Sequence, residues 1–171
     1  VDKLGGIDVE VKDYEVNEIN HYIKEVNGSN SKLLTHSGYQ HLNGQQALSF
    51  SRIRKVGNGD YERTERQRLV LKCLMDKAKQ VDAVKVSQLF TSLLSYVQTN
   101  MPVQKAMDLG MTALKCNGSF QTMRIPVDGY FEPQYVSGLA VLVPDIKANA
   151  QLLKEFIYNM KVTADEDVPV Y

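Results

Sequence analysis

The spacing of the apolar residues changes along this chain, and that change limits the possible folds more than any other feature. Residues 7–11 alternate apolar and charged side chains, as a half-buried strand does. From Asp13 to Leu114 the apolar residues mostly recur at helical spacing, residues 120–127 alternate again, and residues 139–143 form an apolar run. Helices mixed with a few strands predict an α/β or α+β fold in which helices cover a sheet.

The helical pattern is interrupted by loops and glycine-rich breaks that divide it into six segments. These segments run from Asp13 to the break at Gly28, from Gln45 to Phe50, from Asp60 to about Gln80, from Val84 to Asn100, from Pro102 to Leu114 and from Ile146 to Ile157. Asn43, Asp60 and Asp145 are expected to cap their helices, because their side chains can accept hydrogen bonds from free backbone N–H groups. The polar, acidic tail from Thr163 to Tyr171 is expected to fray.

Length and charge exclude several classes of protein. The chain has 171 residues, which suits one domain, and its 20 basic and 20 acidic residues give a net charge of zero. A whole-protein role in nucleic-acid binding usually shows as a basic excess, so zero net charge argues against it. No run of about 18 apolar residues exists, so no segment is expected to span a membrane. The chain starts at Val1 and shows no signal peptide. We therefore expect it to be a piece of a longer protein, in which an anchor or leader could lie upstream.

Metal, redox and hydrolase motifs find little support. Cys73 and Cys116 form no CxxC pair, and the sequence leaves open whether they form a disulfide or stay separate thiols. His21, His36 and His41 are too irregularly spaced for a metal triad, and no serine lies in a G-x-S-x-G elbow. These residues therefore predict no metal centre and no serine hydrolase.

Basic residues gather in one stretch of the chain. Residues 52–72 hold seven basic side chains against three acidic ones, a local charge of +4. The basic ones are Arg52, Arg54, Lys55, Arg63, Arg66, Arg68 and Lys72. The planar guanidinium fork matches paired phosphate or pyrophosphate oxygens, so a binding site for such an anion is one interpretation of this stretch.

The placement of these side chains bears on the same interpretation. Arg63 and Gln67 continue the stripe of the predicted helix whose later members, Val70 and Leu74, are apolar and must face the core. The start of the helix should then open into a polar cleft, where free N–H groups also favour an anion. A solvated helix face with local ion pairs fits the spacing as well, so spacing alone leaves both interpretations open.

Arg52 and Arg54 can both belong to the anion site only with a particular backbone geometry. Residues two apart on a helix point about 200° from each other, at about 100° per residue. Both arginines can reach one ligand only if the chain leaves helical geometry near residues 51–54. Arg52 also shares a helix face with Leu48, which biases its side chain inward.

The same residues resemble the LytR-CpsA-Psr family. The matching stretches are Leu4-Gly5-Gly6-Ile7-Asp8-Val9, then residues 42–54 (LNGQQALSFSRIR), then Asp60-Tyr61-Glu62-Arg63-Thr64-Glu65-Arg66-Gln67. They follow the family's LxG-x-x-AL-x-aromatic-x-R-x-R stretch and its D-x-x-R-x-x-RQ stretch in order and in spacing. The resemblance covers about residues 1–160.

This resemblance implies a fold and an activity. The fold would be an α-β-α sandwich with a mixed sheet and an apolar pocket for a lipid tail. Residues 1–160 would be the catalytic domain without its N-terminal third, and residues 161–171 a C-terminal tail. Members resemble phosphotransferases that move teichoic acid or capsular polysaccharide from an undecaprenyl-pyrophosphate carrier onto peptidoglycan. They are anchored in the membrane of mainly Gram-positive bacteria, with the catalytic domain outside the cell, and no nucleic-acid partner is expected.

The resemblance also implies roles for single residues. The side chains expected to bind the pyrophosphate are Arg52, Arg54, Arg63, Arg66 and Gln67, with Arg54 and Arg63 catalytic and Arg66 supporting the others. Asp60 would cap the helix and orient Arg63 or Arg66. Mg²⁺ is the implied cofactor, and its ligands are expected in the absent third, so none can be named here.

Two rival functions remain on the sequence alone. A module that binds or hydrolyses polyprenyl pyrophosphate without transferring the polymer would carry the same arginines. A DNA-binding regulator is the other rival. The chain has one arginine-rich helix but no net positive charge, which argues against binding to a phosphate backbone.

Overall fold

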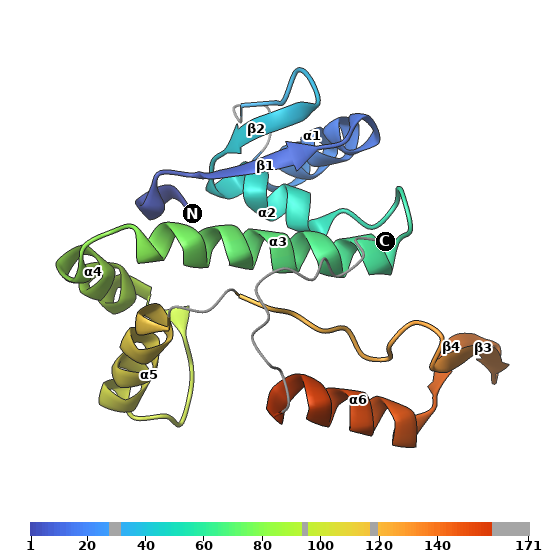
Figure 1. The fold of residues 1–171 in the computed structure, drawn as a ribbon. Coiled ribbons are helices and arrows are strands. Elements are labelled where there is room, and N and C mark those ends of the chain that lie inside the picture. The colour runs from blue at the N-terminus through green and yellow to red at the C-terminus, as the bar shows by residue number, and fades with distance from the viewer. Residues whose placement is uncertain (28–31, 94–95, 117–119, 159–171) are drawn as a thin grey trace. The chain divides into compact units, whose positions relative to one another are not determined.

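The computed structural model describes residues 1–27, 32–93, 96–116 and 120–158. The chain divides into two compact units, Val1–Phe120 and Gln121–Tyr171. Figure 1 shows the order of the elements along the chain.

A two-stranded antiparallel ribbon opens the first unit, after a single turn of 3₁₀ helix at Asp2–Leu4. Strand β1 (Ile7–Val11) pairs with β2 (Gly38–Leu42), and Ile7 lies opposite Leu42. The apolar side chains of β1 are buried and its two acidic side chains are exposed, which confirms the predicted strand. Strand β2 was not predicted, because its sequence GYQHL holds too few apolar residues to show an alternating pattern.

The described residues of the first unit also form five α-helices. They are α1 (Asp13–Asn27), α2 (Gly44–Arg52), α3 (Asp60–Lys79), α4 (Ala83–Leu93) and α5 (Val103–Lys115). All five predicted helices are confirmed, but the helix expected over residues 84–100 is shorter, because residues 97–100 are not helical. Asn43 caps α2 as predicted: its side chain accepts from the Gln46 amide, and the Gln46 side chain accepts from the Asn43 amide, each over 2.9 Å.

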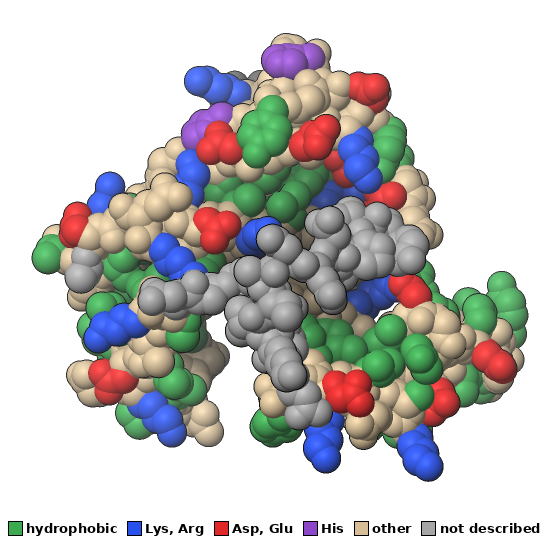
Figure 2. Space-filling model, in the orientation of Figure 1, with side chains coloured by type: hydrophobic (Ala, Val, Ile, Leu, Met, Phe, Trp, Pro, Cys, Tyr) green, Lys and Arg blue, Asp and Glu red, His purple; other side chains and the backbone are tan. Residues whose placement is uncertain are grey.

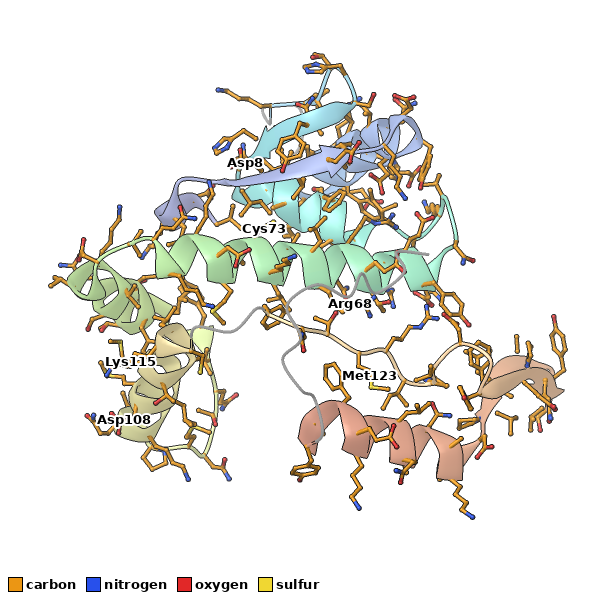
Figure 3. All side chains as sticks on the ribbon, in the orientation of Figure 1. Asp8, Arg68, Cys73, Asp108, Lys115 and Met123 are labelled. Carbon is orange, nitrogen blue, oxygen red and sulfur yellow. The ribbon has the colours of Figure 1, made fainter. Side chains whose placement is uncertain are left out.

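The buried core of the first unit lies among β1, β2, α1 and α2. Its members are Ile7, Val9, Val11, Ile19, Ile23, Leu34, Leu42, Ala47, Phe50 and Ile53. Val70, Cys73 and Leu74 of α3 pack against it from the predicted stripe. Cys73 faces β1, and its Sγ lies 3.7 Å from the carbonyl oxygen of Asp8 (Figure 3). Each large apolar side chain buried in this way contributes about 1.5–3 kcal/mol.

The second unit is a hairpin followed by a helix. Strands β3 (Phe131–Val136) and β4 (Leu139–Pro144) pair antiparallel, and α6 (Ile146–Tyr158) follows. Asp145 caps α6 as predicted, because its Oδ1 accepts from the Ala148 amide over 2.9 Å. The run at residues 139–143 is confirmed as a strand, but β3 was not predicted.

The strand predicted over residues 120–127 is wrong. This segment pairs with none of the described strands. Instead, the buried side chain of Asn149 on α6 accepts from the Val127 amide over 2.8 Å and donates to the Tyr130 carbonyl over 2.8 Å. An alternating pattern predicts an extended backbone, but a strand also needs a neighbour in a ladder, and sequence does not supply one.

The α/β class predicted from the sequence is confirmed. Within the described residues the strands form two separate antiparallel pairs, rather than the single mixed sheet expected of the sandwich. Cys73 and Cys116 are both free thiols, so the open question of a disulfide resolves to separate cysteines. No helix in the described ranges is long and apolar enough to cross a membrane. Most of the break that begins at Gly28 (residues 28–31) and the tail at residues 161–171 lie outside the described residues.

Candidate functional site

Two arginines lie where α2 ends: Arg52 is its last residue, and Arg54 lies two residues further on, outside regular helix. Helix α2 ends at Arg52, and Ile53 has φ −55° and ψ 127°, which is no longer helical. The chain therefore leaves helical geometry in the segment where the sequence required it. Because of this change, Arg52 and Arg54 are not held about 200° apart as they would be on a continuous helix.

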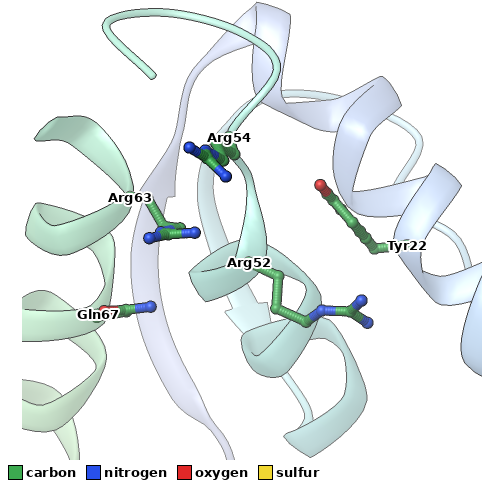
Figure 4. A pocket seen from close by; sticks show the side chains of 5 residues that line it. All are labelled: Tyr22, Arg52, Arg54, Arg63 and Gln67. Carbon is green, nitrogen blue, oxygen red and sulfur yellow. The ribbon is translucent and has the colours of Figure 1, made fainter. Parts of the chain in front are cut away.

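One pocket brings together four side chains that the sequence singled out. It has a volume of about 270 Å³ and is lined by Tyr22, Arg52, Arg54, Arg63 and Gln67 (Figure 4). This volume lies just below the usual range for small-molecule pockets, so it suits a compact polar group better than a large ligand. Three of its five lining side chains carry a permanent positive charge, which favours an anion.

Asp60 ties two of these arginines together. Its Oδ2 accepts from Arg54 Nη2 over 2.9 Å, and its Oδ1 accepts from Arg63 Nη2 over 2.8 Å. The predicted capping role is wrong: the N-cap of α3 is Gly59, no side chain caps the helix, and Asp60 lies in its first turn. The carboxylate is directed to the guanidinium groups instead of to the free N–H groups of the helix.

The third arginine is held differently. The Arg52 guanidinium lies over the ring of Tyr22, 4.8 Å from the ring centroid, in a cation–π contact. Its Nη2 is 3.9 Å from Glu25 Oε2, at the long limit of an ion pair. Gln67 Nε2 reaches the Ser51 carbonyl only at 3.5 Å, a weak hydrogen bond. Arg63 Nε is buried and has no hydrogen-bond partner among the described residues. The pocket therefore keeps donors that are not fully used.

Arg66, which was expected to bind the pyrophosphate and to support the other side chains, lies outside the lining of this pocket. Its side chain is buried, and Nη1 donates to Glu15 over 2.7 Å and to Glu62 over 3.0 Å. Its Nη2 donates to the Ile53 carbonyl over 2.8 Å. Ile53 lies between the pocket residues Arg52 and Arg54 in the chain, so Arg66 acts on the site through the backbone.

Glu62 links this buried arginine to the surface. Its Oε2 also accepts from the Tyr14 hydroxyl over 3.0 Å. Burial raises the pKa of the Glu62 carboxyl, but hydrogen bonds from the Asn58 backbone, Tyr14 and Arg66 outweigh it and hold that pKa below its ordinary value. The Glu62 carboxylate also lies against Gly57, whose φ of +66° and lack of a side chain allow this close approach.

The described residues do not fit a magnesium ion. Mg²⁺ prefers several oxygen ligands, usually carboxylates and waters. No group of three or more His, Cys, Asp or Glu side chains that could hold a metal occurs among the residues described. Asp60, the carboxylate that bridges two of the arginines at the pocket, already has both oxygens in ion pairs.

Tyr22 is the lining residue that sequence reasoning missed. It lies one turn after Ile19 and next to Ile23, both members of the buried stripe of α1. Its place beside that stripe was visible in the sequence, but the basic stretch that indicated an anion site lies at residues 52–72, outside α1. The expected apolar tunnel is not part of this pocket, since Tyr22 alone among its lining residues is aromatic and none is aliphatic.

The sequence and the fold are both similar to those of known proteins. The model of the LytR_cpsA_psr family matches residues 1–157. A polyisoprenyl-teichoic acid–peptidoglycan teichoic acid transferase, TagU of Bacillus mycoides, is 29% identical over 132 residues, which cover 76% of this chain and 39% of the relative. TagV of Bacillus subtilis, with the same transferase description, is 28% identical over 111 residues, which cover 64% of this chain and 27% of the relative. The chain thus spans well under half the length of these curated relatives.

Solved structures agree on the fold. The crystal structure of TagT from Bacillus subtilis superposes with a TM-score of 0.58 at 22% identity and covers 91% of this chain and 53% of that one. Protein gbs0355 from Streptococcus agalactiae superposes with a TM-score of 0.61 at 22% identity and covers 100% of this chain and 57% of that one. Since the family model matches nearly the whole chain and the folds agree, this chain belongs to the LytR_cpsA_psr family.

Proposed function

We propose that this chain is part of a phosphotransferase that attaches a glycopolymer, teichoic acid or capsular polysaccharide, to peptidoglycan. The polymer would arrive on an undecaprenyl-pyrophosphate carrier. Family membership supports this proposal, as do the relatives named teichoic acid transferases. The whole protein would work outside the cytoplasm, anchored at the membrane.

The observation that carries the proposal is the pocket of three guanidinium groups and one amide. Arg52, Arg54 and Arg63 bring paired N–H donors, and Gln67 adds an amide, to one space of about 270 Å³. A diphosphate offers several oxygen acceptors and more than one negative charge in a compact group. Guanidinium forks match such oxygens in pairs, so a pyrophosphate fits this donor set better than a single carboxylate does.

The reaction would be a displacement at phosphorus. A hydroxyl of the acceptor sugar attacks the phosphorus next to the glycan and forms a new P–O bond. The bond from that phosphorus to the bridging oxygen breaks, and lipid phosphate leaves with the electron pair. Arg54 and Arg63 would stabilise the charge on the non-bridging oxygens, which is most of what phosphoryl transfer requires.

Mg²⁺ belongs to this proposal only for the whole protein. The residues described here supply no set of ligands for it, so its ligands would come from elsewhere in the protein. The acceptor proton likewise needs a base other than Asp60, because that carboxylate is engaged by two arginines.

Binding of inorganic pyrophosphate to the 171-residue chain, measured by isothermal titration calorimetry, tests the site. Arg54→Ala and Arg63→Ala should each weaken binding at least tenfold, about the effect of removing one charged hydrogen-bond partner. Lys72→Ala is the matched control, because Lys72 is an exposed cation on the same helix as Arg63 and does not line the pocket. In the full-length protein, either arginine variant should lower polymer transfer by about 100-fold or more. Unchanged transfer in both would contradict the proposal.

One observation favours a second candidate, a module that binds the pyrophosphate lipid without transferring its polymer. The pocket offers donors for the anion, yet its lining holds no carboxylate or imidazole that could act as a base. Such a module would bind pyrophosphate in calorimetry and leave the full-length protein without transferase activity. A pyrophosphatase would instead release glycan phosphate to water in the absence of peptidoglycan.

Duplex DNA remains the alternative partner. On the first unit, where its side chains are visible in Figure 2, Lys and Arg are interspersed with Asp and Glu. Binding to DNA would show as an affinity that falls steeply with added salt. No such binding is expected.

A further inference from the structure

We infer that Tyr22 is a ligand-binding residue of the pocket, with two functions that rest on the proposed pyrophosphate site. Its hydroxyl donates a hydrogen bond to a phosphate oxygen of the bound pyrophosphate. Its ring holds the Arg52 guanidinium beside the same ligand. None of the sequence motifs of the arginine stretch includes this residue, which comes from a different helix.

The position of Tyr22 supports the first function. It is the lining residue supplied by α1. Arg52 ends α2 and Arg54 follows that helix, whereas Arg63 and Gln67 lie on α3. In Figure 4 the hydroxyl end of Tyr22 points toward the side of the pocket where Arg54 and Arg63 lie. A pyrophosphate placed among the arginines would therefore meet the hydroxyl from the opposite wall.

The Tyr22 side chain is anchored at one end and available at the other. Its partly buried ring packs against the core cluster of the first unit, and the His21 ring contacts it edge-on at 5.9 Å between centroids. No hydrogen bond engages its hydroxyl among the described residues. The hydroxyl is not among the buried polar atoms that lack a partner, so it is open to solvent at the pocket wall and can donate to a ligand there.

The ring explains how Arg52 can serve the ligand. The other two pocket arginines are ion-paired with Asp60 at 2.9 and 2.8 Å, but Arg52 is 3.9 Å from its nearest carboxylate, Glu25. Its guanidinium also lies over the Tyr22 ring, 4.8 Å from the ring centroid. A cation–π contact uses the face of the guanidinium and leaves its N–H groups in the plane free to donate. The ring therefore fixes Arg52 without consuming the donors that an anion needs.

Two substitutions separate the two functions, and both are tested by calorimetric titration of the 171-residue chain with inorganic pyrophosphate. Tyr22→Phe removes only the hydroxyl and should weaken binding about tenfold, the effect of one hydrogen bond to a charged group. Tyr22→Leu also removes the ring, releases Arg52, and should weaken binding several-fold more. Tyr39→Phe is the matched control, because Tyr39 on β2 is 79% exposed and does not line the pocket.

A double substitution tests the second function independently of folding. In an Arg52→Ala background, Tyr22→Leu and Tyr22→Phe should weaken binding equally, because the ring no longer has a guanidinium to hold. Thermal unfolding of each variant shows whether the core is intact, and Tyr22→Phe, which keeps the packed ring, should unfold as the wild type does.

The outcomes distinguish this inference from the function on which it rests. If the wild type binds pyrophosphate, Arg63→Ala does not, and Tyr22→Phe binds as the wild type, then the hydroxyl role is wrong while the proposed function stands. If Tyr22→Leu and Tyr22→Phe also bind equally with Arg52 present, the ring does not position Arg52. If the wild type itself fails to bind pyrophosphate, both proposals are overturned.

Discussion

Arg66 on α3 donates a hydrogen bond from Nη2 to the backbone carbonyl of Ile53, over 2.8 Å. Ile53 separates the two pocket arginines Arg52 and Arg54, so this single bond fixes the backbone from which both side chains extend. The same guanidinium is paired with Glu15, which is buried at 2% exposure, over 2.7 Å. Arg66 therefore belongs to the interior ion pair and also holds the backbone beside the pocket. Loss of the ion pair should for this reason also disturb the pocket.

Replacing Arg66 with alanine should destabilise the chain by about 3–5 kcal/mol, because Glu15 would be left as a buried charge without its partner. The free energy of unfolding in urea measures this loss. Lys72→Ala, an exposed substitution on the same helix, should change it by less than about 0.5 kcal/mol. Adding Glu15→Gln to Arg66→Ala should recover part of the stability. A single Arg66→Ala variant as stable as the control would contradict the structural role of this ion pair.

Stability should fall with acid in a way that depends on Glu62. Hydrogen bonds keep the pKa of this carboxyl below its ordinary value in the folded state, so the unfolded chain takes up a proton first as the pH falls. Its contribution is therefore complete above the ordinary glutamate pKa of about 4.3 and is lost below it, toward the folded pKa. The free energy of unfolding in urea should be measured for the wild type and for Glu62→Gln across about pH 3 to 6. The difference between the two proteins should shrink toward the acid end. A difference in unfolding free energy that stays constant with pH would contradict a stabilising role of the Glu62 carboxylate.

The two cysteines should react at different rates. Cys116 is exposed, whereas Cys73 is half-buried on α3, and burial raises the pKa of the Cys73 thiol. Because the thiolate is the reactive form, iodoacetamide at mildly alkaline pH should modify Cys116 well before Cys73. Mass spectrometry of the digested protein, sampled over time, follows both sites. Equal rates, or a recovered peptide that joins the two cysteines, would contradict the structure.

In the second unit, Asn149 should be more important than its exposed neighbours on α6. Its side chain accepts from Val127 and donates to the carbonyls of Tyr130 and Asp145, each over 2.8 Å. Asn149→Ala leaves the Val127 amide without its partner, while the Tyr130 and Asp145 carbonyls each keep a backbone donor, and should cost about 1–3 kcal/mol. Limited proteolysis should then cut residues 120–130 faster than in Lys147→Ala, an exposed substitution on the same helix. Equal cleavage rates in both variants would show that Asn149 does not hold this segment.

Local sequence rules predicted most of the helices, because each has its own signals. Asn43 and Asp145 cap their helices as expected, since capping needs only residues that are three apart in the chain. Strands were harder to predict. The strand β1 shows a clean alternation, but β2 is recognised only from its partner, and residues 120–127 alternate without having one.

The site shows the same division between local and long-range information. The positions of Arg63 and Gln67 follow from one helical stripe, so their shared pocket could be anticipated. Asp60 was misplaced as a cap because Asp at a helix start fits both a cap and an ion pair, and only the position of Arg54 decides between them. Tyr22 and the burial of Arg66 depend on α1 packing beside α2 and α3, which no local pattern records.

The bridge that Asp60 makes between Arg54 and Arg63 has a consequence for whatever anion arrives. Two like charges this close would otherwise repel each other and move apart in solvent. With a carboxylate between them, the guanidinium groups stand ready before any ligand is present, so little entropy is lost in gathering them. Less of the binding free energy of the anion is then lost to rearrangement of the protein.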